Sequence, residues 1–278
     1  MEIKAADVAK LRQMTGAGMM DCKNALVEAA GDFDRAQEII REKGKLVAAK
    51  RADRETTEGA VIAKISADCK KAILVSLGCE TDFVAKNAEF QALANSIADT
   101  ALAVFPADKN GLMATRTGDI TIEELITQQT GKSGEKHAIP YYAAIEANYI
   151  ACYIHTNSKV ATIVGFNKEV SNEAGKDIAM QITAMAPVSL SKSDCPQEVI
   201  EKELEIYREQ IKQDPKMAGK PDEMINKIAE GKLGKFFKEN TLEEQIFVKD
   251  GKISVSDYLK AVDAEAKVTA FRRFSLND

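Results

Sequence analysis

The stretch GAVIAKISADCKKAILVSL, residues 59–77, decides the fold class. Its apolar residues Val61, Ala63 and Ile65 stand at alternate positions, which is the pattern of a strand with one buried face. After a polar turn, residues 72–77 form an apolar run of strand length. A loop and an amphipathic helix follow, and the apolar stripe of that helix consists of Phe90, Leu93, Ala94, Ile97 and Ala98. The local order is therefore strand, turn, strand, loop, helix.

The same order returns later in the chain. Ile150, Cys152 and Ile154 alternate like the residues of the first strand, and residues 160–164 form a second apolar run. Residues 178–183 then carry apolar side chains at helical spacing. We interpret this pattern as a ββα unit that occurs twice. It predicts an α+β fold whose core has antiparallel sheets with helices on one face.

The first part of the chain predicts a small three-helix domain instead. Glycines interrupt the helical periodicity at residues 15–18 and at Gly31, and Asp32 is suited to cap the third helix. A bundle of this size buries little surface, so it is only marginally stable alone. The basic segment at residues 41–54 contains no aromatic residue, so we expect a solvated helix tail rather than a nucleic-acid-binding patch.

Residues 193–240 carry two charged, amphipathic stretches with a break between Pro215 and Pro221. This pattern predicts an antiparallel helical hairpin that projects from the core. The predicted parts are a three-helix domain at residues 1–54, an N-terminal core subdomain at residues 55–140, and a C-terminal core subdomain at residues 141–278 with the hairpin inserted at about 190–238.

Composition limits the classes of function. The chain has 278 residues, 45% of them hydrophobic, and a formal net charge of −5. The acidic balance argues against duplex nucleic acid or an anionic membrane as the main partner, since phosphate binding needs clustered positive charge. No stretch approaches the ~18 consecutive apolar residues of a membrane span. Helical periodicity begins at the first residues, which predicts a cytoplasmic protein without a signal peptide.

Cysteine and histidine usage excludes further classes. The five cysteines are far apart and form no CxxC pair, so we expect neither a disulfide framework nor a zinc site. The sequence contains two histidines and none of the motifs GxSxG, HExxH, GxGxxG or GxxxxGK[ST]. An enzyme of a common hydrolase, kinase or dehydrogenase class is therefore not expected.

The adjacent Met19 and Met20 at the start of the second predicted helix are the first candidate site. Neighbouring helical residues point about 100° apart, so both rarely share one narrow core stripe. At least one should be exposed, beside a glycine turn and close to Arg12 on the preceding helix. Such a surface suits protein docking, and a core role for a single methionine is the alternative.

The second candidate is Thr81-Asp82-Phe83, between a predicted strand and a helix. Loops that follow strands often carry function. Two interpretations stay open: Phe83 packs the helix start into the core while Asp82 caps a turn, or Phe83 protrudes as an aromatic wedge with an acceptor beside it. His155, at the end of a strand in the second unit, is the third candidate, and a satisfied turn or surface residue is its ordinary role.

Two stretches resemble the signature sequences of the bacterial translation elongation factor Ts family: TGAGMMDCK at residues 15–23 and TDFVAKN at residues 81–87. The order of parts is also similar, with a ubiquitin-associated-like three-helix domain, a duplicated core and an inserted helical hairpin. The resemblance covers essentially the whole chain. It implies a guanine-nucleotide exchange factor, without covalent catalysis, that binds elongation factor Tu. Such a factor releases GDP by disrupting the partner's magnesium and phosphate site, so that GTP can rebind during polypeptide elongation.

The resemblance also implies which residues contact the partner: Arg12, Met19, Met20, Thr81, Asp82, Phe83, Val84, His155 and Val248. The N-terminal residues among them would dock on the partner's nucleotide-binding domain. Phe83 would wedge between partner helices near the magnesium site, with Asp82 as a polar contact. His155 and Val248, with the neighbouring Lys249 as a further candidate, would hold another domain of the partner.

The resemblance implies that GDP, GTP and magnesium belong to the partner and that this chain carries no cofactor. We expect no direct contact with nucleic acid or membrane, and a homodimer of the complex through the core or the hairpin stays open. Two other classes also stay open. One is a helical adaptor without exchange activity. The other is an enzyme that uses Cys152 and His155, which requires a lowered thiol pKa at Cys152.

Overall fold

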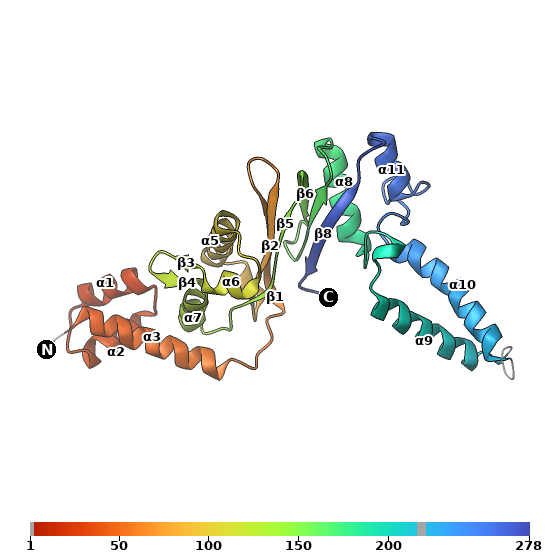
Figure 1. The fold of residues 1–278 in the computed structure, drawn as a ribbon. Helices are drawn as coiled ribbons and strands as arrows, with labels where there is room; N and C mark the ends of the chain where they lie inside the picture. Colours follow the sequence, from red (N-terminus) through yellow and green to blue (C-terminus); the bar gives the residue numbers. More distant parts are fainter. Residues whose placement is uncertain (1–2, 216–220) are drawn as a thin grey trace.

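The computed structural model describes residues 3–215 and 221–278 and shows an α+β protein. Two predictions concern residues outside the described ranges. They are the start of helical periodicity at residues 1–2 and the break between the hairpin arms at residues 216–220. Figure 1 shows an elongated molecule, with helices of the N-terminus at one end, a helical hairpin at the other and sheets between them. Within the described ranges, no helix is long and apolar enough to cross a membrane.

The N-terminal helices are α1 (Ala5–Thr15), α2 (Met19–Glu28) and α3 (Phe33–Lys50). Gly16 ends α1 at a φ of 68°, which glycine adopts without strain. Asp32 caps α3, as predicted, because its carboxylate accepts hydrogen bonds from the backbone N–H groups of Asp34 and Arg35. The small core between the helices consists of Val8, Leu11, Ala17, Cys22, Ala25, Leu26, Ala29 and Ala36.

Two antiparallel sheets occupy the middle of the molecule. The first has the order β1 (Glu58–Ile65), β2 (Lys71–Cys79) and β5 (Ala138–Glu146). The second has the order β6 (Tyr149–Ile154), β7 (Val160–Phe166) and β8 (Val268–Ser275). The two sheets pack face to face, because alternate side chains of each form one shared apolar layer. Its buried members are Val61, Ala63, Ala72, Leu74, Ile145, Ile150, Ala161 and Ile163.

Helices cover the outer face of each sheet (Figure 1). The first sheet carries α4 (Asp82–Ala85), α5 (Ala88–Val104), α6 (Lys109–Ala114) and α7 (Ile122–Ser133). The second sheet carries α8 (Asn172–Met185) and α11 (Val255–Val262). Along the strands the side chains alternate between the two layers, so that Ile62 and Ile73 face the helices while Val61 and Leu74 face the second sheet.

A short hairpin, β3 (Arg116–Thr117) with β4 (Ile120–Thr121), leads into α7. Thr121 and Glu124 form a capping box at the start of α7. The Glu124 carboxylate accepts from the Thr121 backbone N–H at 2.9 Å and from the Thr121 hydroxyl at 3.3 Å. These bonds satisfy groups that would otherwise be free at the helix end.

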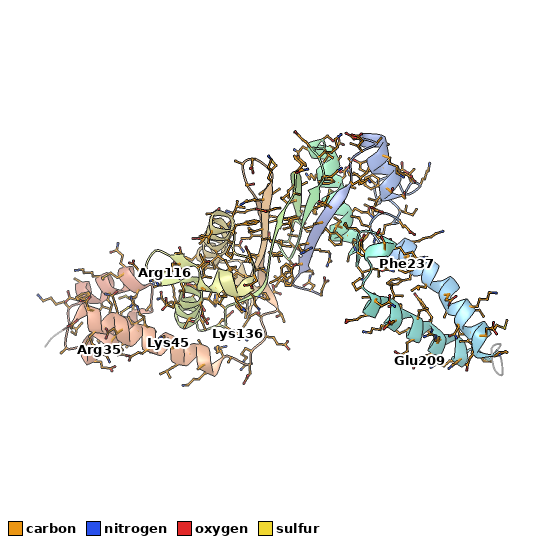
Figure 2. All side chains as sticks on the ribbon, viewed as in Figure 1. Arg35, Lys45, Arg116, Lys136, Glu209 and Phe237 are labelled. Atoms are coloured by element: carbon orange, nitrogen blue, oxygen red, sulfur yellow. The ribbon has the colours of Figure 1, made fainter. Side chains whose placement is uncertain are left out.

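The predicted helical hairpin follows a 3-10 turn at Lys192–Asp194 and consists of α9 (Gln197–Gln213) and α10 (Asp222–Asn240). Its arms hold one another through apolar contacts and through a hydrogen bond of 2.7 Å from Arg208 Nε to Asn226 Oδ1. Figure 2 shows Phe237 near the base of the hairpin and Glu209 near its far end.

Strands β5 and β8 were not predicted. They lie at the edges of their sheets, β5 beside β2 and β8 beside β7. Their burial is irregular along the strand, because polar or bulky side chains such as Arg272 and Tyr141 interrupt the apolar alternation. Most of the segment at residues 268–278 completes the second sheet as β8.

The N-terminal helices pack on the core where α3 crosses α7. Gly44 and Gly131 meet there, and a Cβ added to Gly131 would lie 2.5 Å from the Gly44 Cα. A side chain at this position would therefore strike backbone. The basic segment at residues 41–54 is the last part of α3 with the linker after it. Gly44 packs on α7, while most basic side chains of the segment are exposed, in agreement with the predicted solvated helix tail.

We expect Gly131→Ala to lower the free energy of unfolding by about 1–3 kcal/mol, because the added methyl overpacks the contact between α3 and α7. Gly234→Ala is the matched control, since nothing lies within 4 Å of a Cβ added to this helical glycine. Alanine there should stabilise by about 0.5–1 kcal/mol through helix propensity. Urea unfolding measures both changes, and a stabilising Gly131→Ala would contradict the predicted clash.

Candidate protein-docking site

Phe83 protrudes from the protein. It lies on α4, a single helical turn between β2 and α5, and it is 85% exposed. The interpretation that Phe83 packs the helix start into the core is therefore wrong. Thr81 caps this turn, because its hydroxyl accepts from the backbone N–H of Val84 at 3.4 Å, while the Val84 side chain packs against the core. We call residues 81–85 the Phe83 protrusion.

Asp82 lies beside Phe83 on the Phe83 protrusion and forms a local ion pair. Its carboxylate accepts from Lys86 Nζ at 2.6 Å, one helical turn further on. This hydrogen bond holds the pKa of Asp82 below its usual range, so Asp82 stays ionised. Asp82 therefore offers a charged acceptor next to the exposed ring.

The backbone of the Phe83 protrusion is anchored to distant parts of the chain. The backbone N–H and the hydroxyl of Thr81 both donate to the Glu135 carboxylate, at 3.0 and 2.6 Å. The preceding Glu80 accepts from the backbone N–H of Lys136 at 2.6 Å and from Arg51 Nη1 at 2.8 Å. These contacts give the exposed ring a fixed support.

Glu80 makes this support dependent on pH. The backbone N–H of Lys136, together with the Arg51 guanidinium, holds the pKa of Glu80 below its usual value of about 4.3. A carboxyl with a lowered folded-state pKa contributes its full stability above the unfolded-state pKa and loses it as the pH falls through the folded-state value.

We therefore expect Glu80→Gln to lower the free energy of unfolding at neutral pH. The difference between parent and variant should shrink as the pH falls below about 4.3, where the parent carboxyl also becomes protonated. Urea unfolding at a series of pH values measures the difference. A gap that stays constant down to strongly acidic pH would contradict the role given to Glu80.

Met19 and Met20 begin α2 and are 45% and 64% exposed, which confirms the prediction that at least one of them faces solvent. Arg12 on α1 and Met19 line a surface hollow together with Glu89 of α5 and Lys132 of α7. Lys132 Nζ donates to Glu89 at 2.6 Å. The N-terminal helices and the core therefore contribute jointly to this surface.

Sequence reasoning missed some members of this surface. Met14, near the end of α1, is 53% exposed and lines a separate hollow together with Lys43 and Gly131. In the sequence, Glu89 and Lys132 lie far from α1 and α2, so no local spacing pattern could place them beside Arg12 and Met19. Their contribution becomes visible only once α5 and α7 are packed beside the N-terminal helices.

The candidates in the second half lie on other elements. His155 is exposed in the turn between β6 and β7. Val248 is 44% exposed, and its backbone N–H donates to Gln181 Oε1 at 2.9 Å. Lys249 pairs at 2.6 Å with the buried carboxylate of Asp177, and this contact raises the pKa of Lys249. This ion pair therefore links the loop that contains Lys249 to α8.

The structure divides the candidates into two groups. Arg12 and Met19 line a hollow with Lys132 at the end of α7, and Glu135, just after α7, holds Thr81 of the Phe83 protrusion. His155 and Val248 belong to the half built around the second sheet. Two surfaces on one elongated body can contact two parts of a partner.

The thiol of Cys152 is not activated. Cys152 packs between the two sheets, and burial raises the pKa of its thiol. A nucleophilic cysteine needs a lowered pKa, so this finding contradicts the expectation on which the Cys152 and His155 enzyme rests. The other histidine, His137, is buried, which lowers its pKa, and its Nδ1 lies 3.0 Å from the Glu135 carbonyl oxygen.

The fold and the site together define a class: an elongated α+β protein that presents a supported aromatic ring and exposed methionines, side chains that are enriched in protein interfaces. Residues 80–278 match the family described as Elongation factor TS. The chain is 48% identical to Elongation factor Ts of Christiangramia forsetii over 277 residues, with 99% of both chains covered. It is 47% identical to Elongation factor Ts of Porphyromonas gingivalis, with 100% of this chain and 99% of the relative covered. The chain belongs to the elongation factor Ts family.

Proposed function

We propose that this chain is a guanine-nucleotide exchange factor that binds elongation factor Tu and accelerates the release of GDP. One observation carries the proposal: the ring of Phe83 is 85% exposed on a backbone that Glu135 holds in place. Large aromatic side chains that are held rigidly in solvent are typical anchors of protein interfaces. The resemblance of the TDFVAKN stretch to the family signature supports elongation factor Tu as the partner.

The physical basis is thermodynamic linkage. A protein that binds the nucleotide-free partner more tightly than the GDP-bound partner must weaken GDP binding by the same factor. Contacts to magnesium and phosphate supply much of the nucleotide's affinity. Insertion of Phe83 near that site, with the Asp82 carboxylate beside it, would displace groups that hold the magnesium ion and the phosphates.

Two contact surfaces complete the proposed complex. Residues 1–54 form a ubiquitin-associated-like domain that docks Arg12, Met19 and Met20 on the partner's nucleotide-binding domain. The first core subdomain, residues 55–140, carries Phe83, and the second, residues 141–278 with the hairpin, holds another partner domain through His155 and Val248. Binding through two surfaces fixes the direction in which Phe83 enters the partner.

The proposed exchange involves no covalent step and no cofactor of this chain. GDP, GTP and magnesium are bound by the partner throughout, and the role of this chain is to bind and to displace. We expect no direct contact with nucleic acid.

The test is a nucleotide-release assay. Elongation factor Tu is loaded with a fluorescent GDP analogue, and release is followed by stopped flow at increasing concentrations of this chain with excess unlabelled GDP. We expect the rate to rise with concentration and to reach a plateau. Release at the intrinsic rate at every concentration would overturn the proposal. Binding without faster release would identify the helical adaptor instead.

A further inference from the structure

The connection from the end of α7 to β5, residues 131–136, contacts α3, the turn between α1 and α2, and the Phe83 protrusion. We call it the α7–β5 connection. Gly131 packs against Gly44 of α3. Lys132 extends its side chain beside Gly16, in the turn between α1 and α2, and its Nζ donates to Glu89 at 2.6 Å. The beginning of this connection therefore fixes the N-terminal helices relative to the core.

The later residues of the α7–β5 connection contact Glu80, which follows β2, and the linker that follows α3. The backbone N–H of Lys136 donates to the Glu80 carboxylate at 2.6 Å. Its Nζ donates to the carbonyl oxygens of Ala52 and Arg54, at 2.6 and 2.8 Å, in the linker after α3. Figure 2 shows Lys136 at this linker, below the first sheet and its helices. Lys136 therefore joins the linker to the end of β2.

Glu135 holds the Phe83 protrusion itself. Its two carboxylate oxygens accept from the hydroxyl and the backbone N–H of Thr81, at 2.6 and 3.0 Å. Hydrogen bonds to a charged acceptor are stronger than those between neutral groups. Because the Thr81 hydroxyl also caps α4, the carboxylate fixes both the position and the direction of that single turn.

The exposed ring needs this outside support. Phe83 is 85% exposed, so its own side chain has few contacts that could orient it. A one-turn helix is not stable by itself. The direction of the ring is therefore set by its backbone, and that backbone is set by Thr81 and Glu135.

We propose that Glu135 is a positioning residue of the exchange site: its double hydrogen bond to Thr81 aims Phe83 at the partner. This inference rests on the proposed exchange function. Glu135 acts through Thr81 and does not itself reach the nucleotide. Its loss reduces the rate of GDP release within the complex, while formation of the complex through Arg12, Met19 and Met20 is retained.

The test compares Glu135→Ala with Glu124→Ala. Glu124 is the control, because its carboxylate also accepts from the backbone N–H and the hydroxyl of a threonine, Thr121, at the start of a different helix. Both variants should lose a similar amount of thermal stability. We expect Glu135→Ala to lower the plateau rate of GDP release about tenfold, the value of one charged hydrogen bond, with the half-saturating concentration nearly unchanged. Glu124→Ala should keep the parent plateau.

Two further variants separate positioning from general stability. In Glu135→Gln the amide oxygen can accept from the backbone N–H of Thr81, and the amide NH2 can donate to the Thr81 hydroxyl. This variant should therefore recover most of the rate. Adding Phe83→Ala to Glu135→Ala should lower the rate no further than Phe83→Ala alone, because both act through the same ring. If Glu135→Ala does not fold, Thr81→Val takes its place, since it removes the hydroxyl bond and leaves the carboxylate.

The outcomes distinguish this inference from the proposed function. If the parent protein does not accelerate GDP release, the proposed function fails. If the parent accelerates release and Glu135→Ala, or Thr81→Val in its place, reaches the same plateau, only the positioning role is overturned. The positioning role is also overturned if Glu135→Ala and Glu124→Ala reduce the plateau rate equally. It is overturned as well if the rate reductions of Glu135→Ala and Phe83→Ala add up in the double variant.

Discussion

Replacing Phe83 by alanine slows GDP release from elongation factor Tu by about 30-fold or more at saturating concentrations of the exchange factor. Truncation of an aromatic anchor at an interface removes about 2 kcal/mol or more, and 1.4 kcal/mol corresponds to a factor of ten. Because Phe83 is 85% exposed, the free protein loses almost no packing when the ring is removed. The thermal midpoint should therefore stay close to that of the parent.

Stopped-flow release of a fluorescent GDP analogue measures this effect. Val104→Ala is a suitable control: Val104 is an apolar residue that is 57% exposed at the far end of α5, away from the Phe83 protrusion. The control should release GDP at the parent rate. If folded Phe83→Ala protein releases GDP at the parent rate, Phe83 does not act as a wedge in the exchange.

The double variant Met19→Ala/Met20→Ala weakens the complex by about tenfold or more. Both side chains are largely exposed, so the free protein should lose no more than about 0.5 kcal/mol of stability. If the methionines fill an apolar contact with the partner next to Arg12, as proposed, their truncation leaves a cavity there.

Isothermal titration calorimetry with nucleotide-free elongation factor Tu measures this affinity. Val27→Ala is the control, because Val27 is 59% exposed on the same helix, at its opposite end. Equal affinity of the double variant and the parent would mean that the methionines do not contact the partner. A loss in the control as large as in the double variant would place the contact elsewhere on α2.

The sequence predicted the parts of the fold whose signal is local. In the sequence, β1 and β6 carry apolar residues at alternate positions and β2 and β7 are continuous apolar runs, and the cap at Asp32 needs only its own loop. Strands β5 and β8 lack such a signal because polar or bulky side chains such as Tyr141 and Arg272 interrupt the apolar pattern. The packing of the two sheets against each other was also beyond reach, since it depends on contacts between strands far apart in the chain.

The candidate site shows the same limit. The helical geometry of adjacent residues was enough to predict an exposed methionine at Met19 or Met20. The pattern around Phe83 fits either a buried staple or a protruding wedge, and only the packed structure decides between them. Glu135 could not be predicted as a partner of Thr81, because 54 residues separate them and the contact exists only after α7 and β5 are in place.

The most direct test of exchange is the effect of nucleotide on the affinity of the complex. Calorimetry compares the binding of this chain to elongation factor Tu without nucleotide and with saturating GDP and magnesium. Linkage predicts that the nucleotide weakens binding by the same factor by which this chain weakens nucleotide binding. The complex should therefore hold without nucleotide and loosen when GDP and magnesium are added. Equal affinity under both conditions would contradict an exchange function.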